Sequence, residues 1–272
     1  MQGNSAAASA RADDPLFVNS LAKGFAVLRA FGESRRALGL TEIARLSGLN
    51  MSAAQRFTHT LHALGYLARE PSSRRYRLSP RLLELSFLYQ RASGLAEIAT
   101  PHLVALGEAS DETVQLVELD GPEVVYTLRM PRHQVRNPAA VVGARMPATC
   151  TSSGRAMLAR LPESEAAAIV AASERNALTP ETVTEPEALM ARIAQARRDG
   201  YSIVERECWM SELSVAAPIL DGADRPVAAV GVPVAVRRWT GEQVRRRLAP
   251  LVVETARAIS RTLGAPQAFM ES

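Results

Sequence analysis

Residues 40–67 read LTEIARLSGLNMSAAQRFTHTLHALGYL, and this stretch decides the fold of the first part of the chain. Apolar side chains recur at helical spacing in its first part, where Thr41 is the expected N-cap of a helix. Gly48 supplies the sharp turn that ends this helix. A second helical pattern follows directly over residues 52–64. The two patterns predict a pair of short amphipathic helices joined by a tight turn.

The second of these helices has a polar outer face. Its apolar residues Phe57, Leu61 and Leu64 predict a buried stripe, so the opposite side of the helix faces outward. Gln pairs with adenine, Arg with guanine and Ser with phosphate, which is the side-chain chemistry that a major groove selects. The candidate DNA-binding residues are Thr41, Ser52, Gln55, Arg56, His59, Thr60, Arg74 and Arg75, and His62 is expected to face the same way.

A short basic hairpin follows the two helices. Residues 66–78 are typical of two strands around the turn EPSSRR. Residues 16–78 carry ten basic and three acidic side chains, a net charge of +7, so the rest of the chain sums to −3. Such a segment predicts a winged helix-turn-helix that binds double-stranded DNA. Any surface helix shows a polar outer face, so this feature alone does not identify DNA binding. The alternative class is a winged helix that serves as a protein-interaction module beside a structural C-terminal domain, which would not need the Gln-Arg outer face.

The remaining chain predicts a linker helix and an α+β domain. Leucines at helical spacing follow Ser79, and a strong hairpin signal lies at Asp120-Gly121. Further strands are expected in YSIVERE, LSVAAPIL and PVAAVGVPVAV, and helices over residues 187–198 and 241–263. Helices flanking an antiparallel sheet define an α+β domain. The expected divisions are a mobile tail over residues 1–15, a winged helix-turn-helix over 16–78, a linker helix over 79–95 and an effector-binding domain over 96–272.

Composition excludes several classes of protein. No apolar run approaches the roughly 20 residues of a membrane span, and no secretion signal begins the chain, so a cytoplasmic protein with no membrane partner is expected. The two cysteines, Cys150 and Cys208, form no C-x-x-C pair and are expected to be ordinary half-buried thiols. No metal or organic cofactor is expected.

A serine hydrolase is the enzymatic alternative. Ser152 or Ser153 can serve as nucleophile and His102 or His133 as base, but neither a G-x-S-x-G elbow nor a Ser-x-x-Lys pair is present. The single lysine, Lys23, lies in the DNA-binding half, so no P-loop or Schiff-base lysine can serve the C-terminal domain. We therefore predict that the protein is not an enzyme.

The order of several sequence blocks resembles the IclR family of bacterial transcriptional regulators. The stretch quoted above is followed by YRLSPRLLELS, TSSGRAMLARLP, ARRDGYSIVERE, VAAPILDGADRPVAAVGVPV and VETARAISRTLG, so the resemblance extends from about Phe17 to Gly264. Residues 154–159 read GRAMLA, where many members have Gly-Lys-Ala-Leu-Leu-Ala. The TSSGR form and SLAKGFAVLRAF are similar to the branch that controls protocatechuate and 4-hydroxybenzoate catabolism. The resemblance implies a ligand-responsive regulator whose C-terminal domain has a GAF-like effector-binding fold.

Two clusters are candidates for an effector site. Arg129 and Arg136 lie close in sequence, so their guanidinium groups can bind a carboxylate together. The alternative is that the segment holding them is a solvated loop. Ser152 and Ser153 precede an apparent helix, so their hydroxyls and nearby free N–H groups can converge on an anion or simply cap the helix. The family resemblance implies effector contacts at positions that match pocket residues of related proteins: Met146, Ser152, Ser153, Glu205, Ser214 and Gly231. The expected effector is a small carboxylate, in the similar branch an aromatic acid.

Assembly and regulation complete the expectation. Two chains pair through the first helix and the linker, giving a homodimer or homotetramer whose recognition helices read half-sites about one helical turn apart. Effector binding alters operator binding or promoter activation. RNA polymerase is a further partner only if the protein activates transcription.

Overall fold

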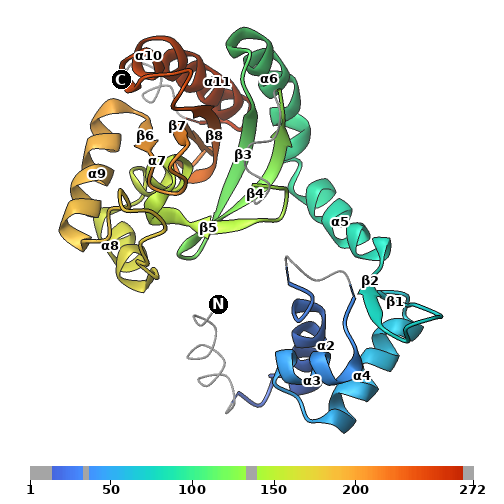
Figure 1. Ribbon diagram of the computed structural model, residues 1–272. Coiled ribbons are helices and arrows are strands. Elements are labelled where there is room, and N and C mark those ends of the chain that lie inside the picture. The colour runs from blue at the N-terminus through green and yellow to red at the C-terminus, as the bar shows by residue number, and fades with distance from the viewer. Residues whose placement is uncertain (1–13, 33–36, 133–139, 266–272) are drawn as a thin grey trace. The chain divides into compact units, whose positions relative to one another are not determined.

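The computed structural model describes residues 14–32, 37–132 and 140–265, which fall into two compact units. The first unit extends to Ala92 and the second begins at Ser93 (Figure 1). Most of the expected tail over residues 1–15 lies outside the described residues, as do His133 and Arg136. None of the helices in the described ranges combines the length and the apolar character that a bilayer span requires.

The first unit is a helix-turn-helix with a hairpin wing, as predicted. Its elements are α2 (Asn19–Arg29), α3 (Leu40–Ser47), α4 (Met51–Ala63), β1 (Leu67–Arg69), β2 (Tyr76–Leu78), the 3-10 turn η1 (Pro80–Leu82) and α5 (Leu83–Ser93). Gly48 ends α3 with a φ of 68°, a left-handed conformation that glycine adopts without strain. The N-cap predicted at Thr41 is wrong, because Gly39 holds that position and donates its N–H to the Glu42 carboxylate at 2.9 Å. Asn50, which was not predicted, caps α4.

The wing is joined to the segment before α3. The backbone N–H groups of Leu38 and Tyr76 each donate to the other residue's carbonyl oxygen at 2.8 Å, which adds a short extended segment beside β2. The core under the helices is built from Val27, Ala30, Phe31, Leu38, Ile43 and Leu67. Leu38 and Leu67 therefore connect the wing to the helical core.

The buried stripe of α4 differs from the predicted one. Ala54 and Thr58 are the buried residues of this helix, whereas Phe57 packs at the edge of the core and Leu64 is 52% exposed. Small side chains allow a helix to lie closer to its neighbours, and a prediction weighted toward large apolar residues misses this. The outward side of α4 is nevertheless the predicted polar one, because Gln55 and His59 are exposed.

The second unit is an antiparallel sheet flanked by helices, which confirms the predicted α+β class (Figure 1). The strand order is β5-β4-β3-β8-β7-β6. The strands are β3 (Val114–Asp120), β4 (Glu123–Met130), β5 (Arg145–Pro147), β6 (Ser202–Glu205), β7 (Glu212–Leu220) and β8 (Pro226–Ala235). The helices are α6 (Leu95–Ser110), α7 (Ser152–Leu158), α8 (Glu163–Ala172), α9 (Pro186–Asp199), α10 (Gly241–Gln243) and α11 (Ala249–Thr262), with the turns η2 (Ala148–Cys150) and η3 (Val244–Leu248).

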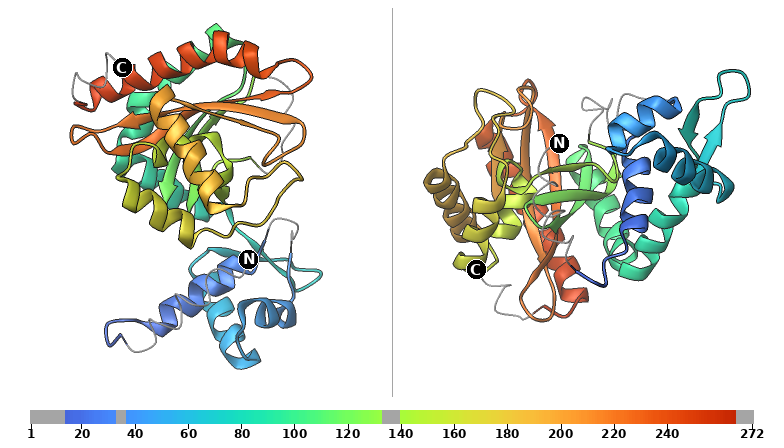
Figure 2. Two further views of the ribbon diagram at one scale, coloured as in Figure 1. Left: turned by 90° about the vertical axis from the view of Figure 1, so that its left-hand side faces the viewer. Right: turned by 90° about the horizontal axis from the view of Figure 1, so that it is seen from below.

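Helices cover both faces of this sheet (Figure 2). Helices α6 and α11 pack on one face, where Leu116 and Val230 are fully buried. Helices α7, α8 and α9 pack on the other, where Val117 and Ala229 are fully buried. Successive strand residues point to opposite faces of a sheet. Strand residues that alternate with the core residues under α6 and α11 therefore point toward α7.

Several features of the second unit were not predicted from the sequence. Helices α6 and α8 and the three-residue strand β5 were missed, and α6 carries Pro101 inside it, a residue that usually argues against a helix. The helix predicted over residues 241–263 is interrupted by the π-helical turn η3. The buried stripe predicted for this helix is Val244, Leu248, Leu251, Thr255 and Ile259. Of these, Val244, Leu248 and Ile259 are buried, whereas after η3 Val252 and Ala256 are buried in place of Leu251 and Thr255.

Candidate DNA-binding face and effector pocket

The outward side of α4 presents the polar residues that the sequence predicts for DNA. Exposed residues on this helix include Ser52, Gln55, Arg56, His59 and Thr60. The Thr60 hydroxyl donates to the Arg56 carbonyl at 3.0 Å, so it is directed back along the helix. Thr41 is exposed on α3. These side chains offer donors and acceptors of the kind that read base edges and phosphates.

The two wing arginines have different environments. Arg75 donates to the Ala37 carbonyl at 3.0 Å and pairs with the Glu42 carboxylate at 2.7 Å, so its guanidinium braces the wing against α3. Arg74 is exposed at the tip of the turn, where its φ is 56°. His62 also serves the fold, because its Nδ1 lies 2.9 Å from the Leu67 carbonyl oxygen. His62 is nevertheless exposed on α4, and its position facing a groove stays a prediction.

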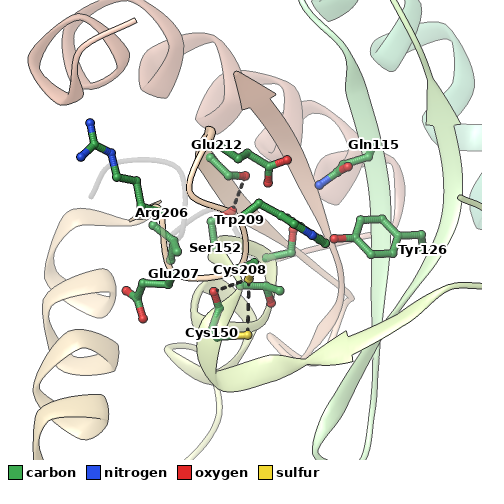
Figure 3. Close-up of a pocket in the computed structure, with 13 residues that line it drawn as sticks. Gln115, Tyr126, Cys150, Ser152, Arg206, Glu207, Cys208, Trp209 and Glu212 are labelled. Carbon is green, nitrogen blue, oxygen red and sulfur yellow. Dashed lines mark hydrogen bonds between the residues drawn. The ribbon is translucent and has the colours of Figure 1, made fainter. Parts of the chain in front are cut away.

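A pocket lies in the second unit, between α7, the sheet and the loop from β6 to β7 (Figure 3). Its cavity volume is about 20 Å³, and the wider space among the lining side chains, which includes open solvent, is about 330 Å³. The lining residues are Gln115, Tyr126, Cys150, Thr151, Ser152, Ser153, Val204, Arg206, Glu207, Cys208, Trp209, Glu212 and Ser214. Hydroxyl, amide and carboxylate groups thus meet two aromatic side chains in one small volume.

The polar floor of the pocket follows from strand alternation. Gln115 lies between two core residues of β3, and Ser214 lies between two core residues of β7, so both point to the face that α7 covers. Gln115 pairs with Gly231 of β8. A Cβ atom at Gly231 would lie 3.1 Å from Gln115 Nε2 and 3.1 Å from Ser153 Oγ. The absence of a side chain there lets the amide and the hydroxyl converge.

Helix α7 enters the pocket through its first turn. Thr151 is the N-cap, and its Oγ1 accepts the Gly154 N–H at 3.1 Å. Ser152 and Ser153 are therefore helical residues, and the alternative that they cap this helix is wrong. The hydroxyls of Ser152 and Ser214 lie 2.8 Å apart, which joins α7 to β7 across the pocket floor.

A buried ion pair fixes the wall of the pocket. The Arg155 guanidinium donates to both Glu207 carboxylate oxygens at 2.6 and 2.7 Å and, through Nε, to the Thr149 carbonyl at 2.7 Å. The exposed fractions of the two side chains are 2% and 8%. Glu207 also accepts the Val183 N–H at 3.0 Å. One charge pair thus ties α7, η2, the β6–β7 loop and the segment before α9 together.

Tyr126 is a buried phenol at the pocket. Burial raises the pKa of Tyr126 well above its usual range, and the nearby carboxylate of Glu212 adds to this. Its hydroxyl points into the pocket from β4 (Figure 3). On the same strand burial lowers the pKa of Arg129, yet a guanidinium stays charged at neutral pH. Arg129 donates to Gln115 Oε1 at 2.7 Å, which leaves the Gln115 amide N–H groups to face the pocket.

The structure places the predicted effector residues as follows. Ser152, Ser153 and Ser214 line the pocket, Gly231 lies against Ser153, and Arg129 orients a lining residue from behind. Met146 packs into the core on β5, and Glu205 is an exposed residue whose carboxylate lies 3.7 Å from Arg206 Nε. Neither Met146 nor Glu205 belongs to the lining. On β6, strand alternation points Val204 into the pocket and Glu205 away from it.

Most of the lining was missed by sequence reasoning. Gln115, Tyr126 and Trp209 come from segments far apart in the chain, and their convergence depends on strand pairing that no local pattern reveals. Arg155 did carry a signal, because it is a lone charge in the apolar run that follows TSSG. Fully buried charges are rare unless paired, so a partner for it could have been sought.

The described lining of the pocket does not match the serine-hydrolase alternative. The described residues that line it include no histidine and no lysine to serve as a base for Ser152 or Ser153. Within the described ranges no three or more His, Cys, Asp or Glu side chains are grouped to hold a metal ion. What the arrangement offers is a set of fixed hydrogen-bond donors beside aromatic surface, which suits reversible binding of a small ligand.

A helix-turn-helix with an exposed polar helix in one unit and a polar pocket in the other are the parts expected of a transcriptional regulator with an effector-binding domain. Residues 20–71 match the IclR helix-turn-helix domain, and residues 88–261 match the family described as bacterial transcriptional regulator IclR C-terminal. The chain belongs to the IclR family, as its sequence blocks predict. It is a regulator with an effector-binding C-terminal domain and not an enzyme.

Relatives within the family differ in the name of the operon that they control. The chain is 32% identical over 251 residues to the Pca regulon regulatory protein of Pseudomonas putida, covering 92% of this chain and 86% of that one. It is 33% identical to the Glycerol operon regulatory protein of Streptomyces coelicolor, with coverages of 91% and 97%. A solved IclR homolog of Microbacterium hydrocarbonoxydans complexed with 4-hydroxybenzoate is 27% identical, with a TM-score of 0.77 and coverages of 90% and 98%.

Proposed function

We propose that the second unit senses a small aromatic carboxylate, of the hydroxybenzoate class, and that its binding changes how the first unit binds an operator. The observation that carries this is the convergence of the Ser152, Ser153 and Gln115 donors with the aromatic side chains of Tyr126 and Trp209. The donors bind the carboxylate, and the rings contact the aromatic face. The P. putida relative and the 4-hydroxybenzoate complex support this choice of effector class.

A thermal-shift titration tests the proposal. An effector at 100 times its dissociation constant should stabilise the second unit by about 2.7 kcal/mol. The panel contains 4-hydroxybenzoate, protocatechuate, glycerol and pyruvate. A clear shift with the aromatic acids alone is expected; a shift with glycerol or pyruvate alone would reject the aromatic class.

Ser153→Ala is the matching pocket variant. Removing one hydroxyl that binds the carboxylate should weaken 4-hydroxybenzoate by about 1.5–3 kcal/mol, because hydrogen bonds to charged groups fall in that range. Ser173→Ala is the control, since Ser173 is also buried and its hydroxyl only donates to the Ile169 carbonyl at 2.8 Å in α8. Affinity is measured by calorimetry. Equal losses in both variants would mean that Ser153 does not contact the effector.

We further propose that two chains, or four, assemble through α2 and α5 and act on double-stranded DNA in the cytoplasm. Within the described part of α5 no residue is buried, and Leu83, Phe87 and Leu88 are 69%, 59% and 60% exposed. Apolar surface of this kind marks a protein interface.

Helix α6, which packs on the sheet, begins two residues after α5 ends, so a shift of the sheet can reach the dimer contact. We expect a coupling of about 1–3 kcal/mol between effector and operator. RNA polymerase is an additional partner if the effect is activation.

Arg56→Ala should relax operator preference. Arg56 is exposed on α4, and a bidentate contact with guanine contributes about 1–3 kcal/mol of discrimination. Binding is measured by anisotropy on an operator obtained by selection and on scrambled DNA. Arg192→Ala, which removes one exposed charge from α9, is the control for net charge. An unchanged preference in Arg56→Ala would remove α4 from base reading, where Ser52, Gln55, His59 and Thr60 are proposed to contribute.

Arg74→Ala should weaken all DNA alike. A wing arginine at an exposed tip is placed to contact a phosphate, and losing one such contact lowers the slope of log affinity against log salt by about 0.9. Operator and scrambled DNA are titrated at several salt concentrations. Arg192→Ala should leave the slope unchanged. A loss confined to the operator would instead make Arg74 a base-reading residue.

A further inference from the structure

The only two cysteines of the chain meet at the pocket. Cys150 ends the turn η2 and is buried, and Cys208 lies in the β6–β7 loop, 58 positions later in the sequence. Their sulfur atoms are 3.4 Å apart, and the Cys208 thiol donates to the Cys150 carbonyl oxygen at 2.9 Å (Figure 3). Both residues line the pocket. The sequence predicts two ordinary thiols with no pairing between them. Folding brings the two cysteines together.

The residue that precedes each cysteine is held by the buried Arg155 side chain. Arg155 donates to the carbonyl of Thr149, which precedes Cys150, and to the carboxylate of Glu207, which precedes Cys208. The Thr182 hydroxyl donates a hydrogen bond to the backbone carbonyl of Glu207 at 2.6 Å. The two thiols therefore face each other on a rigid frame. A disulfide needs sulfur atoms about 2.0 Å apart, which is a small approach from this arrangement.

We propose that Cys150 and Cys208 are a dithiol site that hydroperoxides oxidise to an intramolecular disulfide, which ties the two walls of the effector pocket together. One thiolate sulfur attacks the hydroperoxide, an S–O bond forms, the O–O bond breaks, and the departing oxygen is protonated and leaves as an alcohol, or as water when the oxidant is hydrogen peroxide. The second thiol then attacks the sulfenic sulfur, so that the S–S bond forms, the S–O bond breaks and the sulfenic oxygen leaves as water. Two thiols are oxidised and one peroxide is reduced.

The site is set to react slowly. The hydrogen bond with Cys150, burial and the nearby carboxylates of Glu212 and Glu207 all raise the pKa of the Cys208 thiol above its usual range. Since the thiolate is the reactive form, the raised pKa slows the reaction of Cys208 at neutral pH, and a more alkaline pH speeds it. The pair thus stays reduced under the ordinary conditions of a reducing compartment and responds to sustained oxidant.

Oxidation of the reduced full-length protein with hydrogen peroxide tests the site. Titratable thiols should fall from two per chain to none, the intact mass should fall by two hydrogen atoms, and a non-reducing peptide map should join Cys150 to Cys208. Reduction with dithiothreitol should restore both thiols, and the reaction should be faster at mildly alkaline pH than at neutral pH. Cys150→Ser and Cys208→Ser are the controls, because neither can form the internal link.

Three outcomes would overturn the proposal. In the first, the folded protein keeps both thiols while the urea-unfolded chain loses them. In the second, the disulfide joins two different chains. In the third, each cysteine gains oxygen and no disulfide forms. Any of these would mean that the two thiols are inert packing or independent sites.

The effect on ligand binding rests on the proposed function of the pocket. The oxidised and reduced proteins should differ in their dissociation constant for 4-hydroxybenzoate by at least about fivefold, because the link restricts the wall that contacts the ligand. A mapped link with equal affinities would overturn the regulatory part of the proposal. No binding in either state would count against the proposed effector class alone, and the mapped disulfide would still establish the site.

Discussion

Replacing Arg155 with methionine should lower the free energy of unfolding of the second unit by about 3–5 kcal/mol, because it leaves the buried Glu207 carboxylate without its partner. The Thr149 carbonyl loses its donor as well. For a unit of this size the loss corresponds to a melting temperature lower by roughly 6–20 °C. Both tryptophans, Trp209 and Trp239, lie in the second unit, so urea unfolding followed by their fluorescence reports this unit alone.

A surface pair in the same unit provides the matched control. Arg225 also donates to both oxygens of a carboxylate, that of Glu165, at 3.0 and 2.9 Å, but both side chains are exposed. Solvent screens such a pair, so Arg225→Met should leave the unfolding midpoint almost unchanged. The double variant Arg155→Met with Glu207→Leu should recover much of the loss, since it removes the unpaired charge. Equal effects of the two single variants would show that burial does not set the strength of the Arg155 pair.

The helix-turn-helix could be predicted because its determinants are local. Gly48 ends one helix within the stretch of residues 40–67, and the exposed polar residues of the next helix are close together in the sequence. The interior side was predicted less well. Burial of Ala54 and Thr58 depends on how closely α4 approaches its neighbours, which helical periodicity does not encode.

The pocket could be predicted only in part, because it is assembled by long-range pairing. Ser152 and Ser153 were found through a short motif, whereas Gln115 reaches them through its register with Gly231 on a strand more than a hundred residues away. The proximity of Cys150 and Cys208 depends in the same way on the packing of α7 against the sheet. Residues that share a motif are visible in a sequence, and residues that share a cavity are visible only once the sheet is ordered.

Gly154→Ala should be the most damaging small substitution beside the pocket, lowering the free energy of unfolding of the second unit by about 3 kcal/mol. A Cβ atom at this position would collide with the Ala148 carbonyl oxygen and lie 2.5 Å from Ala148 Cα. Both contacts involve backbone, so no side chain can rotate away, and α7 must move off η2. That movement carries Ser152 and Ser153 with it, and the variant should therefore also lose the thermal shift expected with 4-hydroxybenzoate.

Gly107→Ala separates this steric effect from the ordinary effect of alanine in a helix. Gly107 is a buried glycine of α6 in the same unit, and a Cβ atom there meets only Val114 side-chain carbons, at 3.8 and 3.9 Å. Alanine is favoured over glycine in a helix by about 0.5–1 kcal/mol, so Gly107→Ala should stabilise the unit. Opposite signs for the two substitutions are the expected result of the urea titration. If Gly154→Ala were also neutral or stabilising, η2 would have to yield to α7, and the close approach that positions both serines and Cys150 would not be a fixed feature of the pocket.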